Sequence, residues 1–589
     1  MPVSQMLRPS PEKVSRFVWV RAASIACTLV SMTLGMTACV HQKTSKAELP
    51  SYYGTLEPMA SDAVYFLMTD RFVNGDKSND FVEQGGKYPT YRRELKGPKG
   101  QSAFVGYMGG DFKGILQSAA YIADMGFGAI WLTPIVDQPD EAFSGGEPID
   151  FGGAFKDGGK TGYHGYWGVN FFKVDEHLPS PDLSFAQLTR KLKNEHGIKT
   201  VLDIVLNHGS PAFSMPEQRD RFGKVLDKDG KLVADHQNIK PEMLDANNPL
   251  HQFFNQKPDI LQLADFNPES ERVLDYFVEA YLHWIEQGAD AFRIDTIKHM
   301  PHEFWKKFTD RIRAVHPKFF MFAESYSFEP EFIAQHTLVE NGAVSVLDFP
   351  GRKALLKVFG NLESDFDIAA AGFEYLQDYL FLEGAPYQNP YNLMTFYDNH
   401  DMSRMAANED GFIDAHNWLF TSRGIPVIYY GSEIGFMAGA KEHAGNRNYF
   451  GNKGIAKARS NRIFMNLKRI ATLRKSLVAL QRGLQVNLFL EGERAAFLRV
   501  YQHSGEAQTA LVLLNKSDRA QSFEVDSLLS HGLWKSLVDH SLISVDSGGS
   551  IQRDVEAHSF DILVFEQAVN NDSLKKILTR RMLEGQNTD

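Results

Sequence analysis

Apolar segments that end in polar clusters recur four times in this chain. Each segment has the length of a buried strand, and three of the clusters hold a carboxylate in a setting that suits catalysis. The carboxyl ends of parallel strands open on one rim of a barrel. The repeat therefore predicts a parallel barrel with its chemistry at that rim. The clusters are Asp203-Ile-Val-Leu-Asn207-His208, Ala291-Phe-Arg293-Ile-Asp295-Thr-Ile-Lys298-His299, Phe322-Ala-Glu324 and Phe396-Tyr-Asp398-Asn399-His400-Asp401.

The spacing of apolar runs extends this prediction to a whole barrel. Longer stretches with helical spacing separate the runs, for example 277–285 and 304–312, and strand alternating with helix is typical of a parallel sheet. One short run could equally be a buried helix segment, but eight of them favour an α/β fold, a (β/α)8 TIM barrel over residues 61–208 and 263–474. The runs are Val64–Met68, Ala129–Leu132, Thr200–Leu206, Ala291–Ile294, Phe319–Ala323, Ala343–Leu347, Leu393–Tyr397 and Pro426–Tyr429.

Three further segments depart from the alternation of strand and helix. Residues 209–262 are polar and rich in turn signals, and they predict an excursion domain B after the third strand. After about residue 475 the pattern changes to short alternating runs, which predict a C-terminal antiparallel β-sandwich over 475–567. Residues 568–589 are charged and predict a tail that is either a frayed helix or disordered.

The first residues have the pattern of an export signal. A basic start, an apolar stretch over 22–36 and small residues before Cys39 predict a signal peptide over residues 1–38. The stretch is shorter than the roughly 20 residues of a spanning helix. The residues before Cys39 resemble a bacterial lipobox, which implies a lipid on Cys39 that holds the chain to a bilayer. Ordinary cleavage and an uncleaved anchor are the alternatives. Val40, in place of Asp, favours the outer membrane, at its periplasmic or cell-surface face. Residues 39–60 are predicted as a tether.

Charge and cysteine content limit the partners and the sources of stability. The net charge of −11 is mild and the sequence has no basic stripe, so no nucleic-acid partner is expected. Both cysteines, Cys27 and Cys39, lie in the leader. The mature chain would therefore have no disulfide, although exported chains are permitted them, and would depend on a large core aided by any metal it binds.

The carboxylates at the rim suit glycoside chemistry. Arg293 and Asp295 are two apart on a strand and share one face, and an arginine favours the ionised form of its neighbour, as a nucleophile requires. Glu324 follows an apolar run that should raise its pKa and suit it as a general acid. Glycoside cleavage needs two carboxyl groups, one with a raised pKa that stays protonated and one that stays ionised. Asp401 is a third carboxylate at the predicted rim. For any one of them alone, a structural ion pair or helix cap explains the residue equally well.

As a set, these motifs resemble glycoside hydrolase family 13, the α-amylase family, from about Asp62 to Arg447. The resemblance implies that Asp295 is the nucleophile, Glu324 the general acid/base and Asp401 the transition-state stabiliser. It also implies a set of substrate-binding residues: Arg293, His208, His400, Tyr166, His164, Asp203, Lys298 and Arg447. One departure stands out, because the family usually has an Asp four residues before this Arg and the chain has His443. Either a neighbour such as Glu442 substitutes, or contact with the sugar hydroxyls is weaker.

Oxygen-rich loops predict calcium. The segment Asp70–Asp80 packs carboxylates and amides into a loop that contains a glycine, which suits a hard cation, although an ordinary Asn/Asp turn has the same composition. With Gly109-Gly110-Asp111 it resembles a calcium site of cyclodextrin-handling family members, which implies as ligands Asn74, Asp76, Asn79, Asp80, the carbonyl of Gly109, and Asp111. The resemblance implies a second site between barrel and excursion domain, made by Asn207, Asp265 and the carbonyl of His299.

Together these features predict an α-amylase-type hydrolase that cleaves the α-1,4-glucan of starch or maltodextrins with retention. A cyclodextrin-forming glycosyltransferase is the first alternative, because His208-Gly-Ser-Pro-Ala212, Lys298-His-Met-Pro301 and Tyr326 resemble those enzymes. Those enzymes usually carry two more C-terminal domains, whereas this chain has room for about one. A cyclodextrin-cleaving hydrolase would lack its usual N-terminal domain. A non-catalytic surface starch-binding protein would typically lack one or more of the carboxylates that are present here.

Overall fold

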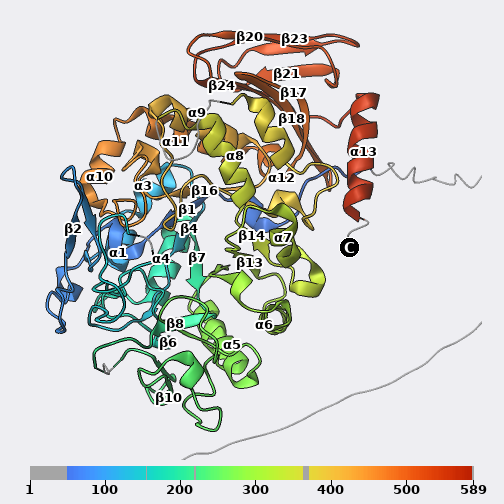
Figure 1. Ribbon diagram of the computed structural model, residues 1–589. Coiled ribbons are helices and arrows are strands. Elements are labelled where there is room, and N and C mark those ends of the chain that lie inside the picture. Colours follow the sequence, from blue (N-terminus) through green and yellow to red (C-terminus); the bar gives the residue numbers. More distant parts are fainter. Residues whose placement is uncertain (1–48, 154, 218–220, 363–370, 587–589) are drawn as a thin grey trace, which may run out of the picture. The chain divides into compact units, whose positions relative to one another are not determined.

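The computed structural model describes residues 49–153, 155–217, 221–362 and 371–586 (Figure 1). The predicted signal peptide, the lipid site at Cys39 and the first part of the predicted tether lie outside these residues. Within them, no helix combines the length and the apolar character needed to cross a membrane.

Eight parallel strands form the barrel, which confirms the predicted fold. They pair in the order β14-β13-β12-β7-β4-β1-β16-β15, and a parallel bridge between Leu347 and Met394 brings the two edges together so that the barrel is nearly closed. These strands are buried, so they appear in the sequence as continuous apolar runs rather than alternating ones. The strands are β1 (Val64–Leu67), β4 (Ala129–Leu132), β7 (Lys199–Ile204), β12 (Ala291–Ile294), β13 (Phe320–Ala323), β14 (Ser345–Val346), β15 (Met394–Thr395) and β16 (Ile425–Tyr429).

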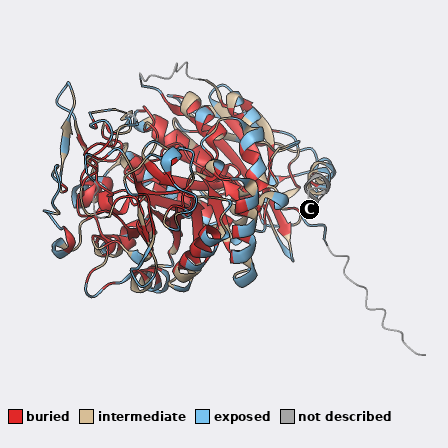
Figure 2. Cartoon of the chain, turned by 60° about the horizontal axis from the view of Figure 1, so that its bottom comes forward, coloured by how far each residue is buried: buried red, intermediate tan, exposed pale blue. Residues whose placement is uncertain are grey.

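Amphipathic helices connect the barrel strands. In α4, for example, Ser184 and Gln187 form a capping box at the start, and Gly197 ends the helix in the left-handed conformation with φ 66°. Figure 2 shows buried residues concentrated in the central strands and exposed residues on the outer faces of helices. The helices are α1 (Thr69–Phe72), α2 (Phe112–Gln117), α3 (Ala119–Asp124), α4 (Phe185–His196), α5 (Glu271–Glu286), α6 (His302–Val315), α7 (Pro330–Ala334), α8 (Phe349–Phe359), α9 (Glu409–Thr421), α10 (Gly451–Ala458), α11 (Arg462–Ser476) and α12 (Val478–Arg482).

The excursion from the barrel contains a small sheet with strands from two parts of the chain. Strands β9 (Lys224–Leu226) and β10 (Leu232–Asp235) come from the predicted segment 209–262, but β5 (Val136–Asp137) and β6 (Asn170–Val174) precede the third barrel strand. A separate apolar cluster that includes Phe143, Trp167 and Phe222 supports this region. Two further short strand pairs belong to this part of the chain: β8 (His208–Pro211) pairs with β11 (Leu263–Asp265), and β2 (Glu94–Lys96) pairs with β3 (Ser102–Phe104).

The C-terminal part is antiparallel and carries a helix. Leu574 and Leu578 of α13 (Asp572–Gln586) are buried in its apolar core, so the segment predicted as a charged tail forms a packed helix. A six-stranded sheet has the order β17-β18-β19-β24-β21-β22, and β20 pairs with β23. The strands are β17 (Leu484–Glu491), β18 (Arg494–His503), β19 (Glu506–Asn515), β20 (Gln521–Val525), β21 (Gly532–Ser536), β22 (Leu542–Val545), β23 (Ile551–Val555) and β24 (Ser559–Phe565).

A buried arginine ties this sheet to the barrel. Arg499 of β18 donates from Nη1 to the carbonyl oxygens of Thr421 and Ser422, both at 2.6 Å, at the end of α9. The last carbonyls of a helix have no partner within it and carry partial negative charge. Burial lowers the pKa of Arg499 to about 10, and the helix end supplies the negative charge that compensates. The sheet thereby holds α9, one of the barrel helices.

A histidine makes a second link. The ring nitrogens of His558 lie 2.7 Å from Asp414 Oδ2 of α9 and 3.0 Å from Asp518 Oδ1. The hydrogen bond to Asp414 raises the pKa of His558 to about 9, because the carboxylates favour the charged ring. An unfolded histidine has a pKa of about 6.5, so the folded chain holds this proton more tightly.

This link predicts a pH dependence of stability. Because the folded pKa lies above the unfolded one, the stabilisation is fully present below about pH 6.5 and is lost as the pH rises through about 9. Burial raises the pKa of Asp414 to about 6, so the comparison starts at about pH 6.5, where this carboxylate is ionised. The difference in Tm between the wild-type chain and His558→Gln should shrink steadily towards about pH 10. A difference that stays constant over this range would contradict the assignment.

Candidate active site

One buried guanidinium holds three carboxylates at the barrel rim. Arg293 of β12 is fully buried, and its Nη1 donates to Asp203 Oδ1 at 2.8 Å and to Asp295 Oδ1 at 2.7 Å. Its Nη2 donates to Glu324 Oε2 at 2.7 Å. The parallel register places Arg293 beside Asp203 on β7, and Glu324 follows the last residue of β13. The structure therefore brings together the two residues predicted as nucleophile and acid.

The environment of Glu324 favours its protonated form. Burial raises the pKa of Glu324 well above its usual value, against the opposing effect of Arg293 and with the help of the nearby Asp401 and Asp295. The apolar run before Glu324 predicts the same direction. Burial likewise raises the pKa of Asp203 to about 7, although Arg293 opposes it. Glu324 can therefore carry a proton at neutral pH, as a general acid must.

Asp401 lies in a different electrostatic setting. Its Oδ1 accepts from Arg447 Nη2 at 2.7 Å, and its Oδ2 lies 3.2 Å from His400 Nε2. Burial alone would raise the pKa of Asp401, but His400 and Arg447 outweigh it and hold the pKa below its usual value. Asp401 stays ionised where Glu324 is protonated, which is the difference in charge that an acid and an electrostatic stabiliser need.

Three histidines present unused nitrogens at the rim. His164 Nε2, His208 Nδ1 and His400 Nδ1 are buried and have no hydrogen-bond partner among the described residues. Burial lowers the pKa of all three, that of His400 to about 3, so the rings are neutral. Buried polar atoms nearly always have partners. Three orphaned imidazole nitrogens around the carboxylates therefore fit the hydroxyl groups of a bound sugar.

Tyr166 lies between the histidines and the carboxylates. Its hydroxyl donates to Asp203 Oδ2 at 2.8 Å, and its ring stacks on His400 with centroids 5.2 Å apart. The backbone N–H of Tyr166 donates to His164 Nδ1 at 3.1 Å. Trp131, which the sequence analysis did not select, also donates to Asp203 Oδ2, at 3.0 Å. The Asp203 carboxylate therefore accepts hydrogen bonds from Arg293, Tyr166 and Trp131, and it holds these side chains in place at the rim.

Comparison with known proteins identifies the family. The model of the α-amylase catalytic domain matches residues 66–475, more than half of the chain. The chain belongs to the α-amylase family, glycoside hydrolase family 13. It is 27% identical to a cyclomaltodextrin glucanotransferase of Thermoanaerobacterium thermosulfurigenes, over 90% of this chain and 70% of that one. It is 27% identical to an α-amylase of Niallia circulans, over 90% and 95%. Among solved structures, the cyclomaltodextrin glucanotransferase CldA, described as having a three-domain ABC distribution, is 28% identical with a TM-score of 0.67, over 86% and 99%.

This member of the α-amylase family has His443 where the family usually has an Asp, and the structure shows which side chain takes the place of that Asp. His443 has a left-handed backbone with φ 53°. Its ring contacts a neighbouring loop, with Nδ1 3.0 Å from the carbonyl oxygen of Gly153. Glu442 instead places Oε1 2.8 Å from Arg447 Nη2, the atom that also holds Asp401. Of the two alternatives, the structure favours substitution by Glu442.

Lys298 and Tyr326 join the loops that follow β12 and β13. Lys298 Nζ donates to the carbonyl oxygen of Tyr326 at 2.8 Å. The Tyr326 side chain, two residues after Glu324, is 42% exposed. An exposed aromatic ring this close to the acid can stack on a sugar that enters or leaves the site.

The structure brings several residues of the first predicted calcium site close together. Asn74 Nδ2 donates to Asp80 Oδ1 at 2.6 Å, while Asn79 Oδ1 is buried without a partner in the described chain. A Cβ at Gly109, whose φ is +87°, would lie 2.3 Å from both the Asn74 and the Asp80 side chains, so this approach requires glycine. Asp111 instead accepts from three backbone N–H groups, including that of Asp76 at 2.7 Å. The unpaired oxygen and the glycine cradle fit an oxygen-liganded cation.

The second predicted site also has an unpaired oxygen. Asp265 Oδ1 is buried with no partner among the described residues, and its Oδ2 accepts from the N–H of Asp259 at 2.7 Å. His299 contacts the same segment, with Nδ1 2.9 Å from Asp259 Oδ2. Burial raises the pKa of Asp265 to about 7. The N–H of Phe266, the residue after Asp265, donates to the carbonyl oxygen of Asn207 at 2.8 Å, so Asn207 lies beside this segment. A cation here would restore the ionised carboxylate, so these residues fit calcium.

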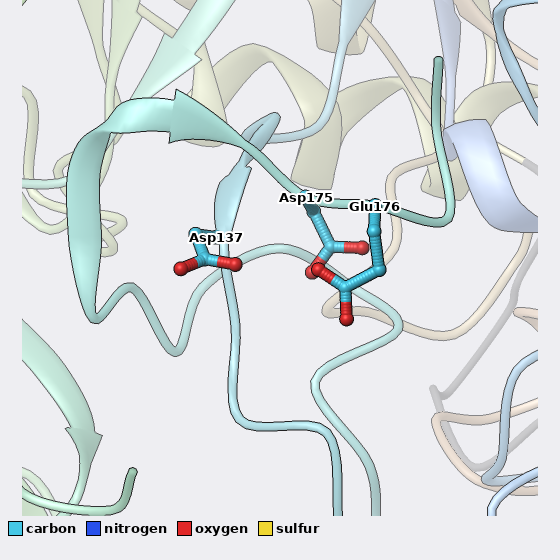
Figure 3. A group of neighbouring side chains, drawn as sticks. All are labelled: Asp137, Asp175 and Glu176. Carbon is cyan, nitrogen blue, oxygen red and sulfur yellow. The ribbon is translucent and has the colours of Figure 1, made fainter. Parts of the chain in front are cut away.

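A third acidic group lies elsewhere and was not predicted. Figure 3 shows Asp137 of β5 near Asp175 and Glu176, which follow β6, and their oxygens lie within 4.8 Å of one another. Asp137 already pairs with Arg221 and, at 3.3 Å, with Lys173. Asp175 Oδ1 lies 2.7 Å from His177 Nδ1. Protein cations therefore neutralise much of this group.

Calcium removal should lower thermal stability. Exhaustive chelation with EGTA is expected to lower Tm by roughly 5–10 °C, the loss expected for ions held about 1,000-fold above their Kd. Added Ca²⁺ should restore Tm. Asp265→Asn and Asp111→Asn should each reduce the shift, whereas Asp229→Asn, in an exposed turn, should not. An unchanged Tm after chelation would count against both sites.

Proposed function

We propose that this enzyme is a retaining α-1,4-glucan hydrolase that acts on starch or maltodextrins. The observation that carries the proposal is the shared guanidinium of Arg293, which holds Asp295 and Glu324 at 2.7 Å each. Retaining glycosidases place their two carboxyl groups about 5–5.5 Å apart, whereas inverting enzymes separate them by about 6.5–9.5 Å to admit a water. Two carboxylates bound to adjacent nitrogens of one guanidinium favour the shorter separation.

The residues then act in two steps. Glu324 donates its proton to the glycosidic oxygen as the C1–O bond breaks, and Asp295 forms a bond to C1. Water enters, gives a proton to Glu324, and its oxygen displaces Asp295 from C1. The ionised Asp401, held by Arg447, favours the positive charge that develops on the sugar ring in both steps. Calcium bound at the two predicted sites would supply fixed positive charge to the loops around the rim and takes no part in these steps.

The substrate class rests on the family and on the unpaired groups at the rim. His164, His208 and His400 offer neutral nitrogens that can donate to or accept from hydroxyls. The relatives are named as amylases and cyclomaltodextrin glucanotransferases, and both names refer to α-glucan chemistry. We also propose export and a lipid on Cys39, which the basic start and apolar run of the leader support.

A cyclodextrin-forming transferase is the second candidate; one observation favours it, and a second removes an objection to it. The ring of Tyr326 is 42% exposed beside the acid, where it could bind a sugar acceptor in place of water. The expectation that such enzymes need extra C-terminal domains no longer separates the candidates, because CldA is described as a three-domain cyclomaltodextrin glucanotransferase. Both candidates share the glycosyl-enzyme intermediate and differ in what attacks it.

Removing the acid should abolish turnover without abolishing binding. Glu324→Gln is expected to lower kcat on starch by about 10²–10⁴-fold, the usual contribution of general acid–base catalysis. Retention of glucan on the variant would be measured by affinity electrophoresis in starch gels. Glu329→Gln, in the same loop but exposed, is the matched control and should keep full activity. Wild-type turnover in Glu324→Gln would refute the assignment of the acid.

Products separate the two candidates. On starch, a hydrolase should release linear maltodextrins whose new reducing ends appear first as the α-anomer by NMR. Cyclic products detected by chromatography would instead establish transfer, and a β-anomer would contradict retention. If Tyr326 supports an acceptor sugar, Tyr326→Ala should lower the ratio of transfer to hydrolysis, while Phe332→Ala, another exposed aromatic nearby in sequence, should leave that ratio unchanged.

A further inference from the structure

Arg352 is a buried arginine whose position near a helix N-terminus disfavours its positive charge. It lies near the start of α8, where the helix carries partial positive charge, and its side chain is fully buried. No carboxylate of the described residues lies within ion-pair distance of its guanidinium. Burial lowers its pKa to about 10, with Asp398 as the nearby acid that opposes the shift. A buried charge without a partner is costly, so the residue needs another explanation.

The hydrogen bonds of Arg352 explain why an arginine is buried at this position. Arg352 Nε donates to the carbonyl oxygen of Tyr397 at 2.9 Å, and Nη2 donates to the carbonyl oxygen of Ser403 at 2.8 Å. These two carbonyls flank the segment 398–402, which carries His400 and Asp401. One planar side chain therefore holds both ends of the loop that presents Asp401 at the rim.

Other side chains hold the same loop from its middle. Asn446 Nδ2 donates to the carbonyl oxygens of His400 at 2.7 Å and Met402 at 3.1 Å. Arg447 Nε also donates to the His400 carbonyl, at 2.8 Å. The loop contains no regular helix or strand, so its shape depends on these side-chain donors to backbone oxygens. Arg447 also binds the Asp401 carboxylate, whereas the two hydrogen bonds of Arg352 go to backbone oxygens just outside the loop.

We propose that Arg352 is a positioning residue for Asp401, which acts by clasping the two ends of the loop 398–402. The inference rests on the proposed glycosidase function. A guanidinium suits this task because its N–H groups diverge in a fixed plane and reach two carbonyls at once. A loop that moves by about 1 Å can lose about 10²-fold in rate. Loss of Arg352 should therefore affect the chemical step more than substrate binding.

The chain offers a matched control. Arg313 of α6 also donates to two backbone carbonyls, those of Gly342 at 2.5 Å and Ala343 at 2.9 Å. These carbonyls precede β14, at the end of the barrel opposite to the rim. Arg313→Met removes an equivalent clasp without touching the loop of Asp401.

The test compares Arg352→Met with Arg313→Met in the full chain, using starch hydrolysis at a temperature well below both Tm values. Arg352→Met should lower kcat by about 100-fold with KM changed less than about threefold. Arg313→Met should lower Tm but keep kcat. Equal kcat values for the two variants would overturn the proposal, because Arg352 would then only stabilise the fold.

Two further variants cover a failure of Arg352→Met to fold. Arg352→Lys keeps the charge but cannot reach both carbonyls, and should lower kcat by roughly tenfold with KM unchanged. Arg352→Ala should regain activity with about 20 mM guanidinium chloride, whereas Glu324→Gln should not. A lysine variant with wild-type kcat would overturn the proposal. Absence of activity in the wild-type chain would refute the glycosidase function itself, and this inference with it.

Discussion

The site depends on one guanidinium that several acids share. Arg293 is fully buried at the centre of the rim, and Asp203, Asp295 and Glu324 all bind it. Removing a guanidinium from water is costly unless its donors are used, and here carboxylates bind both terminal nitrogens, Nη1 and Nη2. The parallel register of β7, β12 and β13 brings these side chains within reach of one another. The barrel therefore serves mainly to hold strand ends in register around this residue.

The site residues that lie on or next to barrel strands could be predicted from the sequence, because the geometry of a strand is regular. Arg293 and Asp295 are two apart and must share a face, and Glu324 follows an apolar run that ends at the same rim. Residues in loops could not be predicted in this way. Glu442 and Asn446 reach the site because the loop after β16 folds back over the segment that holds Asp401, and nothing in their local spacing requires that path.

The same distinction between local and long-range structure applies to the fold. Eight apolar runs were sufficient to predict the barrel, since each is a local signal. The excursion sheet joins β6 to β9, which come from different parts of the chain, and the boundary predicted from composition at residue 209 could not include that pairing. For α13 a frayed helix was one of the two expectations, but its packing was not predicted. Leu574 and Leu578 are four apart and form one apolar face, a signal too short to outweigh the surrounding lysines and arginines.

The balance of charge at the rim explains how such a site can favour a cationic sugar. Five carboxyl groups, those of Asp203, Asp295, Glu324, Asp401 and Glu442, face two guanidiniums, Arg293 and Arg447. If all five were ionised the excess negative charge would be buried at great cost. Burial raises the pKa of Glu324, Asp203 and Glu442, so part of this excess is stored as protonated acid. In the proposed mechanism, Glu324 releases its proton to the leaving oxygen, so a negative charge appears beside the sugar as positive charge develops on it. On this proposal, the free energy spent in burying the carboxylates would stabilise the transition state.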